Sequence, residues 1–192
     1  MRTVTDLTDF TDIEDKISDW VEAASDLPLI EGQEKTYWNG FDFTRKRPYA
    51  TLNIVSQSSP GKPWEERETV DGGLQTISFA PFFWSVDINF YVDSYDDGFE
   101  GTGAAIRETA RTYAQRLQNR AFLPDNQNIL DAVDLSYGQL GQIVTGIQSP
   151  DEDKQIQQAS VEFRFNGIAQ TQVVDSDYFE TVTTPDTTLS GE

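Results

Sequence analysis

The strongest structural signal in this sequence is the stretch FFWSVDINFYV at residues 82–92. Apolar and polar side chains alternate along it, and a period of two residues is typical of a strand with one buried face. The stretch therefore predicts a strand that buries Trp84, Val86, Ile88, Phe90 and Val92 and carries Ser85, Asp87 and Asn89 on the other face, with Phe83 and Tyr91 near its ends.

Other strands are predicted on both sides of this one. Residues 50–55 alternate in the same way, and residues 156–168 alternate so that one face is polar and solvent-exposed. Residues 142–147 give a weaker strand signal. Residues 64–70 and 74–79 flank the turn-forming tripeptide Asp71-Gly72-Gly73, which predicts a hairpin or a long loop. We expect residues 29–43 to be extended, residues 56–63 to form a loop, and Pro81 to interrupt the strand.

Two main helices are predicted. The first covers residues 11–25, with a capping box from Thr11 to Glu14 and a stop before Pro28. The second covers residues 102–120, and a short third helix is expected within residues 124–134. Apolar residues at helical spacing give the two main helices their buried stripes: Ile13, Ile17, Trp20, Val21 and Ala24, then Ile106, Ala110, Tyr113, Ala114 and Leu117.

These elements predict an α+β fold with a mostly antiparallel β-sheet, two main flanking helices and a long hairpin or loop. We expect one domain over residues 1–170. Residues 171–192 read as a polar tail that is ordered only by partners. No apolar run is long enough for a membrane span, and the first ten residues lack the apolar core of a signal peptide, so we expect assembly in the cytoplasm and no membrane partner.

Composition excludes several kinds of chemistry. The chain has no Cys and no His, which removes disulfides, thiolate nucleophiles, Ser-His-Asp triads and the commonest transition-metal ligands. Its net charge of −19 repels phosphate backbones and argues against an ordinary nucleic-acid-binding module. We therefore expect no enzymatic activity and no cofactor, although carboxylate, Lys or Tyr chemistry remains open.

An acidic, glycine-rich segment follows the central strand. Gly98-Phe99-Glu100-Gly101-Thr102-Gly103 lies where phosphate-binding loops occur, but its spacing fits neither a dinucleotide fingerprint nor a Walker loop. The nearby carboxylates of Asp93, Asp96, Asp97 and Glu100 would repel a phosphate, and they also lack the spacing of an EF-hand. A solvated acidic loop is the favoured interpretation, with a bound cation as the alternative.

Two groups of residues are candidates for a subunit interface. Arg45-Lys46-Arg47 is the only compact basic cluster; it suits acidic residues of a neighbouring subunit better than DNA in a chain this acidic. Aromatic residues around the central strand are more numerous than one strand face can bury, so core packing and an interface are both open for Trp64, Phe79, Phe82, Phe83 and Trp84.

The order of motifs resembles the neck and tail terminator proteins of tailed phages over roughly residues 10–170. The resemblance is carried by a helix with Trp20, by Arg47-Pro48-Tyr49-Ala50-Thr51-Leu52 opening a strand, by a charged hairpin and an aromatic-ending strand, by a helix at residues 104–117, and by an alternating strand at residues 159–165. The polar tail and the acidity depart from it.

This resemblance implies a structural virion protein. Such a protein would form a ring, with a hexamer expected, that caps the tail tube and joins it to the head connector while phage DNA passes through without specific binding. Its partners would be copies of itself, the tail tube protein and a connector or neck protein. The alternatives are a head-completion, connector or tail tube subunit, or a small α+β enzyme or binding protein.

Overall fold

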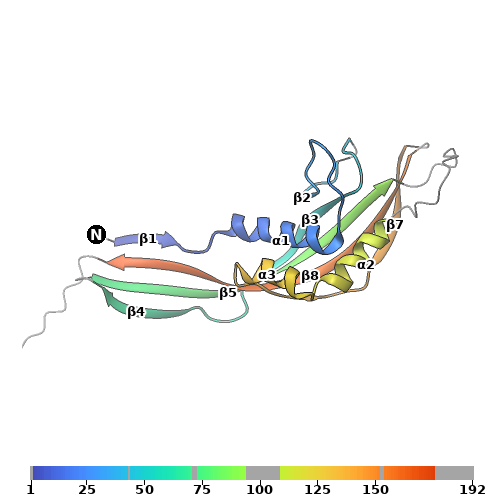
Figure 1. Cartoon of the computed structure of the whole chain (residues 1–192). Coiled ribbons are helices and arrows are strands. Elements are labelled where there is room, and N and C mark those ends of the chain that lie inside the picture. Colours follow the sequence, from blue (N-terminus) through green and yellow to red (C-terminus); the bar gives the residue numbers. More distant parts are fainter. Residues whose placement is uncertain (1, 43, 71–72, 94–108, 152–153, 176–192) are drawn as a thin grey trace, which may run out of the picture. The chain divides into compact units, whose positions relative to one another are not determined.

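The computed structural model describes residues 2–42, 44–70, 73–93, 109–151 and 154–175. These residues form three helices and a mixed, mostly antiparallel sheet of eight strands, which confirms the predicted α+β class (Figure 1). The chain divides into two compact units, and strands β5 (Gly73–Asp93) and β8 (Lys154–Asp175) contribute residues to both. We describe each unit by itself.

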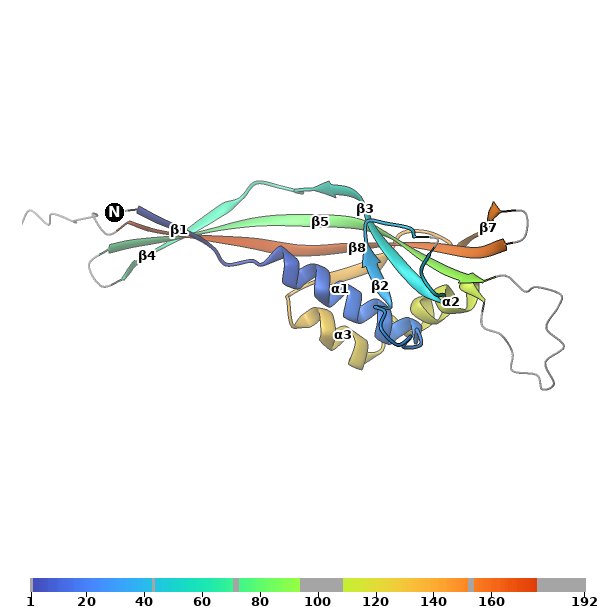
Figure 2. The ribbon, with the colours of Figure 1, turned by 90° about the horizontal axis from the view of Figure 1, so that it is seen from above.

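The larger unit comprises residues 9–62 and 81–168. Strand β3 (Tyr49–Ser58) pairs antiparallel with β5, and β2 (Thr36–Trp38) pairs parallel with β3. On the other side, β8 neighbours β5 and also pairs antiparallel with β6 (Ser136–Gln139) and β7 (Val144–Asp151). Figure 2 shows helices α1 (Phe10–Ser25), α2 (Ala110–Arg120) and α3 (Pro124–Asp131) gathered on one side of this sheet.

The core of the larger unit lies between these helices and the sheet. The predicted stripe of β5 is confirmed for Trp84, Val86, Ile88 and Phe90, which are buried, whereas Val92 is half-buried. Ser85 and Asn89 of the opposite face are also buried. Trp20 of α1 is fully buried and sits between three aromatic rings, with centroid distances of 5.0 Å to Tyr137, 5.0 Å to Phe163 and 5.6 Å to Phe165. Edge-to-face contacts of this kind suit the charge distribution of aromatic rings. The core is therefore built on residues that the alternation and the helical spacing predicted.

Helix α1 begins earlier than predicted, and the capping box from Thr11 to Glu14 is wrong. Asp9 is the N-cap, and its carboxylate accepts a hydrogen bond of 2.8 Å from the backbone N–H of Thr11. The helix ends at Asp26, whose left-handed backbone stops the chain from continuing as a helix. The five predicted apolar residues of its stripe are all buried.

Helix α2 shows its predicted buried face from Ala110 to Leu117. Its N-cap is Thr109, which forms a capping box with Thr112. The predicted start of this helix at residue 102, Ile106 in its stripe and the glycine-rich segment 98–103 lie outside the described residues. The short third helix is confirmed as α3, and Pro124 occupies its first turn, where a missing N–H is tolerated.

The strands are longer than predicted. Strand β3 runs to Ser58 into the segment expected to be a loop, and β5 continues through Pro81 without a break. Strand β8 crosses residue 170 and reaches Asp175. The proposed boundary between a domain at residues 1–170 and a tail at 171–192 stays a prediction, because residues 176–192 lie outside the described part.

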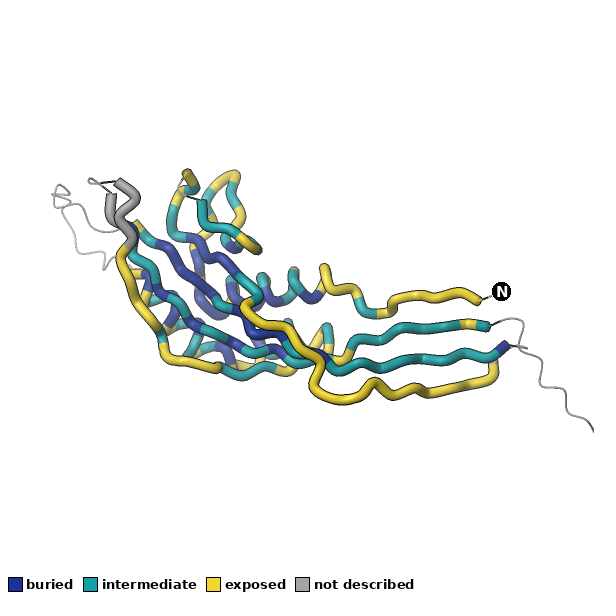
Figure 3. Tube along the Cα trace, turned by 180° about the vertical axis from the view of Figure 1, so that it is seen from behind, coloured by how far each residue is buried: buried dark blue, intermediate teal, exposed yellow. Residues whose placement is uncertain are grey.

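The smaller unit comprises residues 1–8, 63–80 and 169–192. The predicted hairpin is confirmed: β4 (Trp64–Val70) pairs antiparallel with β5 from Trp64↔Phe79 to Val70↔Gly73. Strand β1 (Arg2–Asp6), which the sequence did not predict, pairs antiparallel with β8 from Arg2↔Asp175 to Asp6↔Thr171. Among the described side chains of this unit none is buried, and Gly73 is the one buried residue (Figure 3).

Candidate subunit interface

The basic cluster at residues 45–47 is largely engaged within its own chain. The Arg45 guanidinium lies 3.3 Å from an Asp42 carboxylate oxygen and 3.4 Å from the centre of the Tyr37 ring. The Arg47 guanidinium donates a 2.9 Å hydrogen bond to the carboxylate of Asp93, and its side chain is nearly buried. Of the three cations predicted to face a neighbouring subunit, Lys46 is the exposed one.

The loop that carries this cluster is held by hydrogen bonds and by aromatic packing. The side-chain amide of Gln33 accepts a hydrogen bond of 3.0 Å from the backbone N–H of Lys46 and donates one of 2.6 Å to the Lys46 carbonyl. Two hydrogen bonds from Thr44 hold the pKa of the Asp42 carboxyl below its ordinary value. Tyr49 is fully buried, and its hydroxyl donates a hydrogen bond of 2.8 Å to the carbonyl of Asp42. Arg45 and Arg47 therefore stabilise the conformation of this loop through contacts within their own chain.

The aromatic candidates separate into two groups. Phe82 and Trp84 are 7% and 3% exposed, and Phe10 packs against both rings with centroid distances of 5.5 Å. Phe83 is half-buried beneath the guanidinium of Arg164, 3.7 Å from its ring centre. These positions place Phe82 and Trp84 in the core of the larger unit and leave Phe83 partly accessible.

The remaining pair lies on the hairpin of the smaller unit. Trp64 stacks on Phe79 with a centroid distance of 5.2 Å and an angle of 10° between the rings. Trp64 is nevertheless 43% exposed, and Phe79 is half-buried. A stacked aromatic pair that stays accessible to solvent is a candidate apolar contact surface, because aromatic residues are enriched at protein–protein interfaces.

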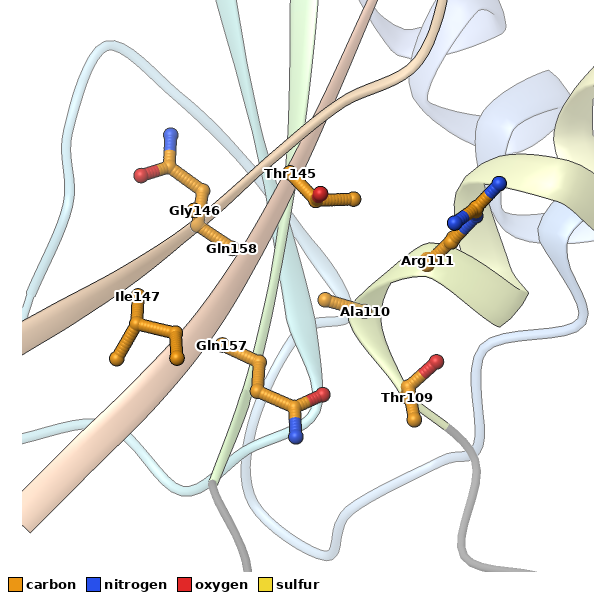
Figure 4. Close-up of a pocket in the computed structure, with 8 residues that line it drawn as sticks. All are labelled: Thr109, Ala110, Arg111, Thr145, Gly146, Ile147, Gln157 and Gln158. Atoms are coloured by element: carbon orange, nitrogen blue, oxygen red, sulfur yellow. The ribbon is translucent and has the colours of Figure 1, made fainter.

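One open cavity of about 400 Å³ lies in the larger unit (Figure 4). Thr109, Ala110 and Arg111 line it from the start of α2, while Thr145, Gly146, Ile147, Gln157 and Gln158 line it from β7 and β8. The eight lining residues offer amides, hydroxyls and one guanidinium but no carboxylate. Proton transfer by a paired carboxylate is therefore not built into this lining.

The acidic segment after the central strand is only partly described. Asp93 belongs to β5 and binds Arg47, whereas Asp96, Asp97 and Glu100 lie outside the described residues. Within the described ranges, no three acidic side chains gather closely enough to hold a metal ion. In the same ranges no helix combines the length and the apolar character that a membrane crossing requires.

Comparison with protein families matches residues 11–192 to the model described as phage neck terminator protein. The matched residues include all of the larger unit except Asp9 and Phe10. The chain belongs to the phage neck terminator family. Comparison with curated proteins finds no match. Membership in the neck terminator family gives the chain a structural role in the phage neck and makes it a virion component.

The sequence did not predict a further exposed apolar surface. Phe122 and Leu123, between α2 and α3, are 53% and 49% exposed. They follow Arg116 and Arg120 of a helix that contains no acidic residue. The signal was present in the sequence as two arginines four residues apart, but the aromatic stretches near the central strand drew the prediction away from it.

Proposed function

We propose that this protein is a ring-forming tail terminator that caps the tail tube and joins it to the head connector. The observation that carries the proposal is the family match, which extends over residues 11–192. A finite collar requires each copy to use one surface to bind the next copy and a different surface to bind the previous one, until the ring closes. The resemblance of the sequence to tail terminators favours about six copies.

The smaller unit supports a role in assembly. Sheets are normally stabilised by burying at least one face against another layer. In the described chain the sheet formed by β1, β4 and parts of β5 and β8 buries no side chain. We propose that this sheet is covered in the virion by partners, and that residues 171–192 contact those partners as well.

The candidate interface residues enter this proposal with different weights. Lys46, Trp64, Phe79 and Phe83 are at least partly accessible and are proposed to contact neighbouring subunits directly. Arg45, Arg47, Phe82 and Trp84 are proposed to support those contacts from within their own chain, where the structure gives each of them an internal neighbour.

The strong negative charge is compatible with passage of DNA through such a ring. A wall built from copies that each carry −19 offers phosphates no counterion-release binding, so DNA would pass without being held. We propose that acidic side chains line the channel. Their replacement by neutral amides should slow DNA ejection, and unchanged ejection would remove the idea.

The test of the terminator role is assembly in the presence of growing tail tubes. Light scattering gives the mass of the purified protein, and negative-stain images show whether closed rings form. Closed rings that stop tube growth support the proposal. Open filaments of the protein itself would identify a tube subunit instead, and a monomer that leaves tube growth unchanged would reject a terminator.

A further inference from the structure

Two surfaces of the described chain carry opposite charge, and each is flanked by exposed apolar side chains. The first, the hairpin face, consists of Trp64, Glu66 and Glu68 of β4 with Ile77 and Phe79 of β5. The second, the arginine corner, consists of Arg116 and Arg120 of α2 with Phe122 and Leu123. We propose that the hairpin face of one copy binds the arginine corner of the next copy, an inference that rests on the proposed function.

The strand register places the hairpin residues on one face. Side chains alternate along β4, so Trp64, Glu66 and Glu68 point the same way. Their cross-strand partners are Phe79, Ile77 and Gln75, which lie on the same face. One shallow hollow on the hairpin is lined by Glu66, Arg67, Glu68, Gln75 and Ile77. The face therefore has an aromatic end and a carboxylate end.

The arginine corner is an exception in a chain of net charge −19. Among the described helices and strands, α2 alone has a net positive charge, with Arg111, Arg116 and Arg120 and no acidic residue. Asp26 lies 4.0 Å from Arg116 and 3.5 Å from Arg120, and the side chain of Arg120 stays 43% exposed. The partly exposed Arg120 guanidinium can therefore meet a carboxylate of another copy, and Phe122, two residues further along the chain, adds an exposed ring.

The charged residues of the two surfaces match in spacing. Glu66 and Glu68 are two residues apart on a strand, which separates them by about 6.6 Å. Arg116 and Arg120 are four residues apart on a helix, which separates them by about 6 Å. On the hairpin, Trp64 continues the row of carboxylates, whereas Phe122 follows the end of α2 and stacks on Tyr137 with ring centroids 5.3 Å apart. Two carboxylates can therefore face two guanidiniums at a similar spacing, with an aromatic ring near each pair of charges.

A second copy of this chain is the occupant that fits these observations. Copies of net charge −19 repel one another, so association needs a local positive surface facing a negative one. Because the two surfaces are different, their contact is head-to-tail, which is the kind that builds rings. Duplex DNA would also be attracted to these partly exposed arginines, so DNA binding and assembly are measured separately.

Charge reversal with matched controls tests the contact. Glu66→Arg reverses the hairpin face, whereas Glu65→Arg makes the same charge change on the opposite face of the same strand. Arg120→Glu reverses the corner, whereas Arg111→Glu lies about 180° around the same helix. At low salt, Glu66→Arg and Arg120→Glu should each raise the concentration needed for ring assembly at least about tenfold. The two controls should leave it unchanged.

Mixing the two variants shows whether the contact joins different copies. In an equimolar mixture, each intact hairpin can meet an intact corner and each reversed hairpin a reversed corner, so rings should form again. Rescue only when both changes are in one chain would show a contact within the chain and overturn the proposal. The proposal would also be overturned if the controls impaired ring assembly as much as the variants did, or if neither variant impaired it. The same holds if the variants lost DNA binding but still assembled.

The result is separable from the fate of the proposed function. A wild-type protein that stops tube growth while Glu66→Arg assembles normally would reject this contact and keep the terminator role. A wild-type protein that neither assembles nor affects tubes would reject the terminator role itself, and the contact with it.

Discussion

Gly167 in β8 lies at a place where no side chain fits. A Cβ atom there would come within 2.8 Å of two ring atoms of Phe82 and 2.9 Å of a methyl carbon of Leu135. Because Phe82 is itself held by Phe10 and Trp84, its ring has little room to move aside. The absence of a side chain at residue 167 therefore lets Phe82 pack against β8.

We expect Gly167→Ala to lower the free energy of unfolding by about 1–3 kcal/mol, the usual cost of overpacking a core. Urea unfolding followed by tryptophan fluorescence measures the change. The control is Gly138→Ala in β6, where a Cβ would meet nothing within 4 Å. Equal stability of the two variants would contradict the packing argument.

The buried tyrosines predict a dependence of stability on alkaline pH. Burial raises the pKa of the Tyr49, Tyr91 and Tyr137 hydroxyls above their ordinary value of 10.0. The folded chain therefore keeps these protons to higher pH than the unfolded chain does. Their contribution to stability is complete below pH 10.0 and is lost as pH rises above it.

Urea unfolding at a series of pH values tests whether stability falls in this way at alkaline pH. The unfolding midpoint should fall once the pH exceeds 10.0, and tyrosinate absorbance should appear later in the folded protein than in urea. Tyr49→Phe should flatten the decline at a small loss of stability at neutral pH, because it also removes the hydrogen bond to the Asp42 carbonyl. A midpoint that rises with pH in this range would show that the sign is wrong.

At the scale of elements, the start of α1 is set by one side chain. Asp9→Ala removes the carboxylate that accepts from the N–H of Thr11 and should destabilise the chain by about 1 kcal/mol. Thr11→Ala should cost less, since its hydroxyl is not the cap. Thermal unfolding monitored by circular dichroism compares the two. A larger effect of Thr11→Ala would restore the capping box that the sequence suggested.

Sequence periodicity predicted the elements whose side chains face the core. The stripe of α1 and four of the five residues in that of β5 were predicted correctly, because burial selects apolar residues at a fixed spacing. Periodicity failed at strand β1, whose residues are all exposed, so no buried face marks its sequence. Pairing across the sheet, which no local pattern records, defines that strand.

Pro81 illustrates why the length of β5 was underestimated. Proline lacks the N–H that a central strand needs, so it was read as an interruption. In the structure β5 pairs with β4 up to Phe79 and with β3 from Phe83 onward, and Pro81 lies between these two ladders. The carbonyl of Pro81 accepts a hydrogen bond of 2.7 Å from the Ser59 hydroxyl.

The accessibility of the candidate interface residues could not be predicted from the sequence. Counting aromatic residues cannot show that Phe10 would cover Phe82 and Trp84, because this contact spans more than seventy residues of chain. In the same way, the charge of Arg47 was visible in the sequence, but its pairing with Asp93 depends on the fold. Exposure, unlike composition, is a property of the folded chain.

At the scale of the whole molecule, the two units should differ in local stability. Backbone amides are protected from hydrogen exchange where burial and packing oppose local opening. The larger unit has a core, whereas the described side chains of the smaller unit are at most half-buried. In the isolated protein, amides of β1 and β4 should therefore exchange at least about tenfold faster than those of β5 at residues 86–90.

Hydrogen exchange measured by mass spectrometry tests this in the free protein and in assembled rings. If the hairpin face binds a neighbouring copy, β4 should become protected on assembly. The matched reference is the first part of β3, residues 49–52, whose protection should change little because these residues are already buried in the free chain. Equal exchange of the two units in the free protein would contradict the difference in packing.

The continuous course of β5 also constrains how the gene can change. Residues 73–79 of this strand pair with β4 and residues 83–91 pair with β3, so one uninterrupted pleat serves both ladders. Deleting a single codon between them would turn every side chain on one stretch to the opposite face relative to the other stretch. Losing two codons would keep both faces. Related genes should therefore differ in length here by even numbers of codons, or carry a bulge that restores the phase.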